Sequence, residues 1–227
     1  AIGGAALVPE ESQNVSVGLT SSFIENLNLS LDYYSIDITN KIIKSRNLPV
    51  QGNSDFSSLA FYTNALNTKT SGIDLVATYT LKWGTLLGIA VNSNKTDVKS
   101  QNQVDDLDPV SSSTIFNLEN NLPEIRILAN VNHSFSDVLA LMIRINHYGE
   151  TIDERSDKEK VNPVQLVDIE LAYKISSNME VVLGGNNVLN TYPTEIETRL
   201  SQGMPYPRRT PIGYHGGMIF TRLNYNF

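Results

Sequence analysis

The chain has 227 residues and a formal net charge of -7, from 24 acidic and 17 basic side chains. Because the sequence holds no basic cluster, this charge argues against a nucleic-acid partner. The absence of cysteine excludes disulfides, thiolate catalysis and cysteine-ligated metals. The mean hydropathy is -0.17, and no apolar run approaches the ~18 residues of a membrane helix. The lack of such a run excludes membrane-spanning helices only. The strands of a membrane β-barrel alternate lipid-facing and lumen-facing side chains, so their average hydropathy resembles that of a soluble protein.

Apolar and polar side chains alternate along most of the chain. In one stretch Leu27, Leu29 and Leu31 are opposed by Asn28 and Ser30. Alternate side chains of a strand point to opposite sides, so each such stretch is predicted to be a strand with one apolar and one polar face. The predicted strands are residues 12–23, 27–44, 73–81, 87–97, 125–135, 139–146, 167–175, 179–185 and 212–227.

The connections between these strands alternate strictly in length. The predicted short turns are residues 24–26, 82–84, 136–137 and 176–178. The predicted long loops are residues 45–67, 98–122, 150–163 and 188–211, with a helical turn at 56–62 inside the first. Outer-membrane barrels have short turns at one end and long loops at the other, and their strands need about 9–11 residues to cross the bilayer.

The pattern therefore predicts an all-β fold, an antiparallel meander transmembrane β-barrel of about nine strands, with residues 1–227 in one domain. Two groups of side chains follow from this interpretation. The membrane-interface aromatics are predicted to be Phe23, Tyr79, Trp83, Phe135, Tyr173 and Tyr225, with Phe227 at the end of the chain. The lumen-facing charges are predicted to be Asp32, Asp74, Arg126, Arg144, Asp168, Glu170, Lys174, Glu180 and Arg222.

Short motifs spread over the chain resemble those of TonB-dependent outer-membrane receptors. They are LVPEES at residues 7–12, LDYYSIDI at 31–38, NA at 64–65 followed by SGIDL at 71–75, LGGNNVLN at 183–190, Gly203 with Tyr206, and the terminal Tyr225 and Phe227. Each motif is weak alone, but their order and spacing are specific. Val188 and Leu189 replace the usual Leu-Phe pair, and Asp74 replaces the commoner Glu, both conservatively.

The resemblance implies a 22-stranded barrel around an N-terminal plug domain, of which this chain would hold about the last nine strands. Nothing in the sequence resembles the plug or the TonB box. Single-chain bacterial barrels have an even number of strands, and lipid does not tolerate open strand edges, so the edges are expected to pair with missing strands or a partner copy. The expected location is the bacterial outer membrane, with long loops extracellular and the C-terminus periplasmic.

The function that the resemblance implies is active import of a scarce nutrient, by default a ferric siderophore, with cobalamin, carbohydrate and peptide cargo left open. The implied partners are TonB acting through the plug, outer-membrane lipid and lipopolysaccharide, and the barrel assembly machinery, which would read Phe227 as a signal. A passive porin or adhesin barrel and a secreted soluble β-sandwich that binds carbohydrate are the alternatives.

Candidate site residues are few. Tyr206, Arg208 and Arg209 in the last loop could meet an anionic substrate or a lipopolysaccharide phosphate, although an exposed basic pair is the simpler interpretation. His133, His147 and His215 lack metal-ligand spacing, and Asp105, Asp106 and Asp108 lack the pattern of a calcium loop. The sequence shows no catalytic constellation or nucleotide fingerprint, so neither an enzyme nor a cofactor is predicted.

Overall fold

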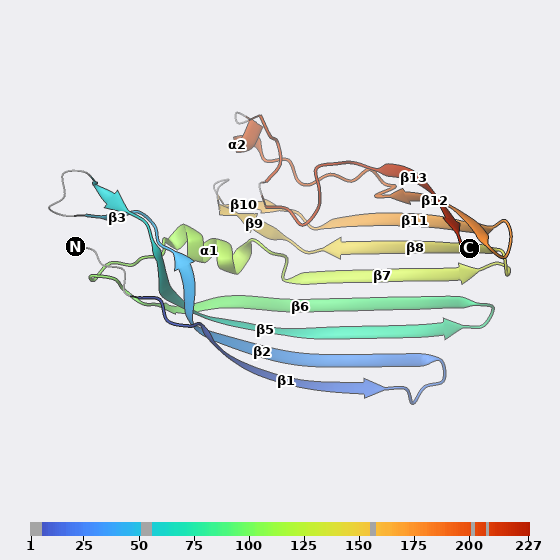
Figure 1. Ribbon diagram of the computed structural model, residues 1–227, viewed down its shortest axis with the longest axis horizontal. Helices are drawn as coiled ribbons and strands as arrows, with labels where there is room; N and C mark the ends of the chain where they lie inside the picture. The colour runs from blue at the N-terminus through green and yellow to red at the C-terminus, as the bar shows by residue number, and fades with distance from the viewer. Residues whose placement is uncertain (1–5, 51–55, 155–157, 201–202, 208) are drawn as a thin grey trace.

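The structure is a computed structural model, and it describes residues 6–50, 56–154, 158–200, 203–207 and 209–227. Nine antiparallel strands form one sheet in which every strand pairs with its neighbours in the chain, as predicted (Figure 1). In sheet order they are β1 (Glu11–Ser21), β2 (Leu27–Lys44), β5 (Tyr62–Leu81), β6 (Thr85–Gln101), β7 (Ile125–Ser134), β8 (Leu139–Tyr148), β11 (Val164–Lys174), β12 (Met179–Asn186) and β13 (Met218–Tyr225).

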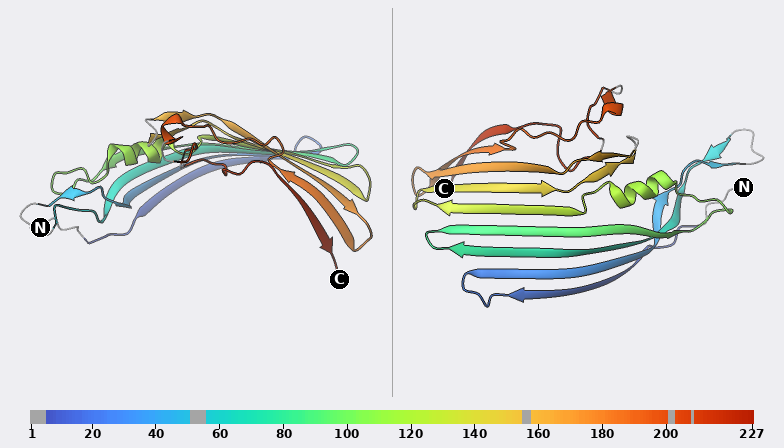
Figure 2. Two further views of the ribbon diagram at one scale, coloured as in Figure 1. Left: turned by 90° about the horizontal axis from the view of Figure 1, so that it is seen from above. Right: turned by 180° about the vertical axis from the view of Figure 1, so that it is seen from behind.

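The short turns gather at one end of the sheet and the long connections at the other (Figure 1). Four small strands and two helices lie within the long connections: β3 (Leu48–Pro49) paired with β4 (Ser58–Leu59), β9 (Thr151–Asp153) paired with β10 (Glu159–Val161), α1 (Ser112–Asn120) and α2 (Glu197–Leu200). Seen from above, the sheet is curved rather than flat (Figure 2). Among the described residues, no helix is long and apolar enough to span a membrane.

The structure differs from the sequence predictions in three places. The helical turn at 56–62 is absent, because Leu59 pairs with Leu48 in a small sheet and Tyr62 pairs with Lys44 as the first residue of β5. Helix α1 was not predicted. The closing strand begins at Met218 rather than at residue 212, because the Gly217 N–H donates to the Asn190 side chain (2.9 Å) instead of to the sheet.

The register gives the sheet one apolar and one polar face, because residues directly opposite each other share a face. Leu31 lies opposite Leu75, and Leu75 lies opposite Val91. One residue further along each strand, Asp32 lies opposite Asp74. This alternation confirms the two-faced sheet that the sequence predicts.

The apolar band on this sheet runs obliquely to the strands. Near the long connections its last apolar residue on β2 is Tyr33, whereas on β13 it is Ile219, which the register sets level with Leu27 of β2. From β2 to β13 the limit of the band shifts by six residues, or about 20 Å along the strands, over seven steps between strands, or about 34 Å across the sheet. At the opposite limit of the band, Tyr225 of β13 likewise lies closer to the short-turn end than Tyr79 of β5, which is level with Ile219. Both limits of the band therefore slope the same way, at about 30° to the row of paired residues.

Candidate functional site

The four long connections pack against one another to form a continuous layer at one end of the sheet. The backbone N–H of Arg46, in the first connection, donates to the Pro109 carbonyl in the second at 2.7 Å, and the Arg46 Nε donates to the Asp108 carbonyl at 2.8 Å. The Lys158 Nζ of the third lies 4.7 Å from the ring centroid of Phe116 in the second. The fourth joins through Thr194, whose hydroxyl accepts from the Asn162 N–H at 2.9 Å. Segments far apart in sequence thus fix one surface.

Helix α1 protects the part of β6 that extends beyond β7. The hydroxyl of Ser111 accepts from the Thr114 N–H at 3.2 Å and caps the helix. The Glu119 Oε1 accepts from the Val98 N–H of β6 at 2.8 Å, so a backbone donor at the edge of the sheet is satisfied by a side chain. Ile115 then packs against the small buried core of this end, which is formed by Ala65, Leu66 and Val110 with Ile43, Val98 and Leu118 around it.

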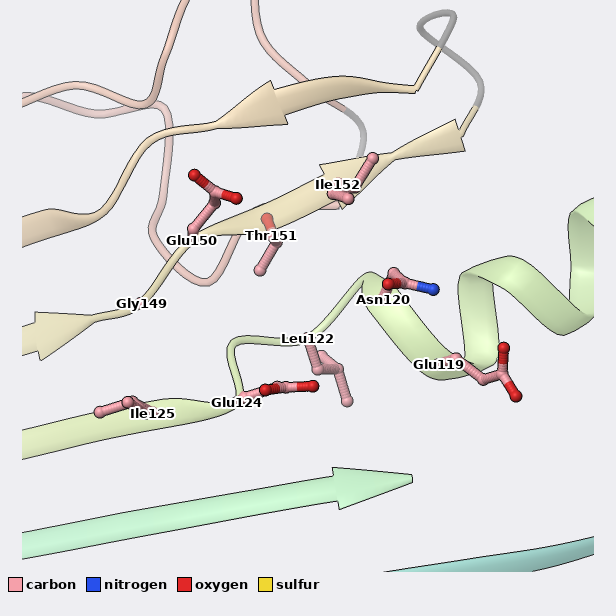
Figure 3. A pocket seen from close by; sticks show the side chains of 9 residues that line it. All are labelled: Glu119, Asn120, Leu122, Glu124, Ile125, Gly149, Glu150, Thr151 and Ile152. Atoms are coloured by element: carbon pink, nitrogen blue, oxygen red, sulfur yellow. The ribbon is translucent and has the colours of Figure 1, made fainter. Parts of the chain in front are cut away.

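A cavity of about 330 Å³ lies between the end of α1 and the start of β9 (Figure 3). The carboxylates of Glu119, Glu124 and Glu150 line it. Glu150 forms an ion pair with the Lys160 Nζ at 2.9 Å. No three acidic or histidine side chains of the described residues lie close enough together to hold a metal ion. The lining suits a cationic or hydroxyl-bearing group better than an anion.

The predicted substrate residues fall in the fourth connection. Tyr206 is stacked between Tyr192 (centroids 6.2 Å apart) and Tyr214 (5.7 Å). Arg209 is exposed, and Arg208 lies outside the described residues. These three tyrosines come from positions 192, 206 and 214, a spacing that follows no helix or strand period. Sequence reasoning therefore missed the stack.

The acidic residues of the second connection form a turn. Asp105 and Asp106 have positive φ, 47° and 60°, between the paired residues Val104 and Leu107. Asp108 accepts from the Gln103 side chain at 3.2 Å. Short acidic side chains are suited to such a turn because they tolerate the left-handed region.

The charged residues predicted to face a lumen all lie on the polar face of the main sheet. Arg222 forms an ion pair with Glu170 at 2.9 Å, and the Arg126 guanidinium lies 5.2 Å from the Tyr148 ring centroid. Asp32 and Asp74 are direct cross-strand neighbours on this face. The set is Asp32, Asp74, Arg126, Arg144, Asp168, Glu170, Lys174, Glu180 and Arg222.

The aromatic residues predicted at an interface are all exposed and lie at or near the short-turn end: Phe23, Tyr79, Trp83, Phe135, Tyr173 and Tyr225. Phe227 is fully exposed and its ring meets that of Tyr225 edge to face. The histidines are dispersed. His133 bonds to the Thr85 hydroxyl (2.7 Å), His147 bonds to the Gln165 amide (3.0 Å) and His215 is exposed.

Residues from two of the sequence motifs stabilise the irregular part of β2 near the long connections. The Asn64 side chain accepts from the Val8 N–H (2.9 Å) and donates to the carbonyls of Val8 (2.8 Å) and Asn40 (2.6 Å). Asn40 has a φ of 57°, where the pairing between β2 and β5 shifts. The Glu10 carboxylate accepts from the Ile42 N–H at 2.7 Å. These side chains replace ladder bonds that the irregularity removes.

A third motif, at residues 183–190, shapes the exit from β12. Asn187 and Asn190 have positive φ, 47° and 54°. The Asn187 Oδ1 accepts from the Thr191 N–H and the Asn190 Oδ1 from the Gly217 N–H, each at 2.9 Å. The Asp168 carboxylate accepts from the Asn187 N–H at 2.9 Å. The asparagines therefore have a structural role, since they tolerate this conformation and hydrogen-bond locally.

The sequence matches a family model described as the TonB dependent receptor-like β-barrel over residues 1–188. The chain belongs to this family. The predicted resemblance is thereby confirmed, and with it the fold, a nine-stranded portion of a transmembrane β-barrel. Membership indicates an outer-membrane location and a receptor rather than an enzyme family. No curated protein matches the sequence significantly.

Several solved structures are similar to this TonB-dependent receptor chain. The FrpB iron transporter of Neisseria meningitidis (F3-3 variant) has a TM-score of 0.71 and 16% identity, over 98% of this chain and 32% of that one. A mutant of the ferric enterobactin receptor PfeA of Pseudomonas aeruginosa has a TM-score of 0.66 and 17% identity, over 96% and 31%. The ferric-catecholate import receptor Fiu of K12 E. coli has 0.65 and 15%, over 99% and 29%. The chain thus spans about a third of these proteins and shares their fold.

Proposed function

We propose that this chain forms the C-terminal part of the barrel of a TonB-dependent receptor that imports a scarce nutrient across the outer membrane. A ferric siderophore is the default cargo, because similar structures include a ferric enterobactin receptor and a ferric-catecholate import receptor by name. The family model matches residues 1–188, and the proposal assigns to the complete receptor the activity that this family membership suggests.

The oblique apolar band is the observation that carries this proposal. Strands of a barrel cross the membrane at a tilt, so a planar hydrocarbon layer cuts across them obliquely and at the same slope on both sides. The two limits of the band descend together from Tyr33 and Tyr79 to Ile219 and Tyr225. A band of this shape supports contact between the apolar face and lipid.

The opposite face would then line a wet lumen. Asp32 and Asp74 lie directly opposite each other, and like charges in such positions repel unless water or a counter-charge separates them. A polar lumen and a plug domain that presents basic groups would both supply that environment. TonB would act through the plug, which rearranges to open a path for cargo.

The edges of the sheet support a larger barrel. In the described part of the chain, β1 pairs with β2 alone and β13 with β12 alone. Unpaired backbone groups on an edge strand are not tolerated in hydrocarbon. Further strands of the complete receptor would therefore pair with both edges.

In this arrangement the layer of long connections is extracellular, and the short turns, with the C-terminus, are periplasmic. Because the chain has no cysteine, the variants Gln103→Cys and Ser177→Cys test each end separately. In the complete receptor, made otherwise free of cysteine, a membrane-impermeant maleimide added to intact cells should label position 103 and spare position 177. Labelling of position 177 alone would reverse the orientation.

Growth rescue tests the function. A receptor-deficient strain that expresses the complete receptor should grow on one of a panel of iron complexes, cobalamin, oligosaccharides or peptides, and the same strain without TonB should not. Growth that persists without TonB would indicate a passive pore. A protein that stays monodisperse without detergent would overturn the membrane assignment itself.

A further inference from the structure

The cavity between α1 and β9 offers hydrogen-bond acceptors rather than donors. The side-chain N–H of Asn120 donates to the Phe116 carbonyl at 2.9 Å, which leaves the Asn120 Oδ1 on the side of the cavity (Figure 3). The Gly149 N–H donates to the Ile125 carbonyl at 2.8 Å, so this donor is also engaged. The ionised carboxylates of the lining can only accept. A ligand that fits the cavity must therefore supply N–H or O–H donors.

The three carboxylates of the cavity are only partly neutralised within the described part of the chain. Glu119 uses its Oε1 to accept from the Val98 N–H at 2.8 Å. Glu150 pairs with Lys160, and the two side chains are 41% and 67% exposed. Glu124 forms no side-chain hydrogen bond or ion pair with a described residue. Three acidic groups thus share one basic partner, and the cavity favours a cationic ligand.

A buried hydroxyl in the same lining has no hydrogen-bond partner. Thr151 is 3% exposed, and its Oγ1 makes no hydrogen bond within the described part of the chain. The Thr151 side chain extends from β9 among the other lining residues (Figure 3). Because buried hydroxyls are nearly always hydrogen-bonded, this unpaired group points to a ligand that would bond to it.

Apolar side chains complete the lining. Leu122 is 74% exposed and Ile125 is 44% exposed, and Ile152 follows Thr151 in β9. A metal ion does not suit this site, since the carboxylates of the described residues do not converge closely enough to hold one. The volume of about 330 Å³ is at the small end of the range for ligand pockets. The lining therefore suits a small organic cation that has an alkyl portion.

We propose that this cavity binds a linear alkyl diamine or polyamine, with an ammonium group at the carboxylates and the methylene chain against Leu122 and Ile125. An ammonium group has three N–H donors and no acceptor, which matches the lining. Its hydrogen bonds to carboxylates are charge-assisted and stronger than neutral ones. This ligand site goes beyond the nutrient import proposed above, and neither proposal depends on the other. Since α1 and β9 belong to different connections, a bound amine also holds the second and third connections together.

Isothermal titration calorimetry of the detergent-solubilised complete receptor with 1,4-diaminobutane tests this proposal. The receptor should bind one diamine saturably at physiological salt, and at least about tenfold more tightly than it binds 1,4-butanediol or Mg²⁺. The variant Glu124→Gln/Glu150→Gln should weaken diamine binding by about a hundredfold, since each charged hydrogen bond contributes roughly tenfold. Thr151→Val, which removes only the hydroxyl, should weaken it by about threefold or more.

The control variant is Asp105→Asn/Asp106→Asn, which removes the same charge from the second connection. Asparagine tolerates the positive φ of both positions, so this variant should bind the diamine as the unaltered receptor does. Phosphates of copurified lipid would bind amines equally in every variant, so the difference between the two double variants isolates the cavity. Saturating diamine should also slow hydrogen exchange at residues 119–125 and 149–152 by about tenfold or more in the receptor, but not in Glu124→Gln/Glu150→Gln.

Equal diamine affinity in the two double variants would overturn the inference, as would equal affinity for the diol. Tighter binding of Mg²⁺ than of the diamine would also overturn it, because the carboxylates would then serve a metal ion. Heat-modifiable electrophoretic mobility reports whether each variant is a folded barrel. Should the double variant not fold, the single variant Glu124→Gln decides, and unchanged affinity there refutes the site. A receptor that imports its nutrient but binds no diamine refutes this inference and leaves the proposed function standing.

Discussion

Replacing Asn64 by alanine should loosen the segment before β1 without unfolding the sheet. The Asn64 side chain makes three hydrogen bonds, two with the backbone of Val8 and one with the carbonyl of Asn40. Each contributes about 1 kcal/mol net. Because the two bonds with Val8 are exposed to solvent, the loss of local stability should be about 1–3 kcal/mol. Alanine leaves the backbone of β5 unchanged, so the effect should be confined to these partners.

Hydrogen exchange of the complete receptor in detergent measures this loss directly. A decrease of about 1–3 kcal/mol in opening free energy corresponds to roughly 5- to 150-fold faster exchange, expected at Val8 and near residues 40–42. The control is Asn28→Ala on β2, an exposed asparagine whose side chain makes no hydrogen bond within the described part of the chain, and it should change exchange by less than about twofold. Unchanged exchange at Val8 in the Asn64 variant would refute the role assigned to this motif residue.

Three further changes probe other parts of the chain. Glu119→Ala should leave the Val98 N–H without an acceptor and speed exchange in α1 by roughly tenfold, whereas Glu119→Gln should retain protection; equal effects would exclude the hydrogen bond as the cause. Trp83→Asn should relieve about 1–2 kcal/mol of backbone strain, so hydrogen exchange in the turn should become slower. Insertion into lipid vesicles should also become slower, because the indole is lost. Slower exchange without slower insertion would contradict an anchoring role. Deletion of Phe227 should slow assembly in cells, as followed by pulse-chase and protease resistance, and unaltered kinetics would rule out the assembly signal.

The strands could be predicted from sequence because alternation alone specifies them. The polarity of side chains such as Leu31 and Asp32 indicates the face of the sheet on which each lies, and the short turns imply that each strand pairs with its neighbour in the chain. The long connections could not be predicted in this way. Their small elements depend on contacts between distant segments, such as Arg46 with Pro109.

Helix α1 and the tyrosine stack illustrate the same limit. The nine residues of α1 include few strong helix formers. The helix is stabilised by the hydrogen bond between its Glu119 and the Val98 N–H of β6, and by packing against the core around Val110. Tyr206 is a candidate from sequence because it lies beside the basic pair Arg208 and Arg209, but its neighbours in the stack are 14 and 8 residues away in sequence. No periodic pattern links such positions, so neither the surface formed by the long connections nor its cavity could be predicted from the sequence.

The turn between β5 and β6 shows where the sequence departs from local preference. Trp83 and Gly84 both have positive φ, 70° and 73°, the conformation for which Asn-Gly is the favoured pair. Of the eight non-glycine residues with positive φ in the described chain, six are Asn or Asp. Trp83 is 89% exposed, so packing within the chain does not offset its strain. We propose that the contact that offsets this strain comes from the membrane interface, where an indole would place its apolar body in lipid and its N–H in the polar layer.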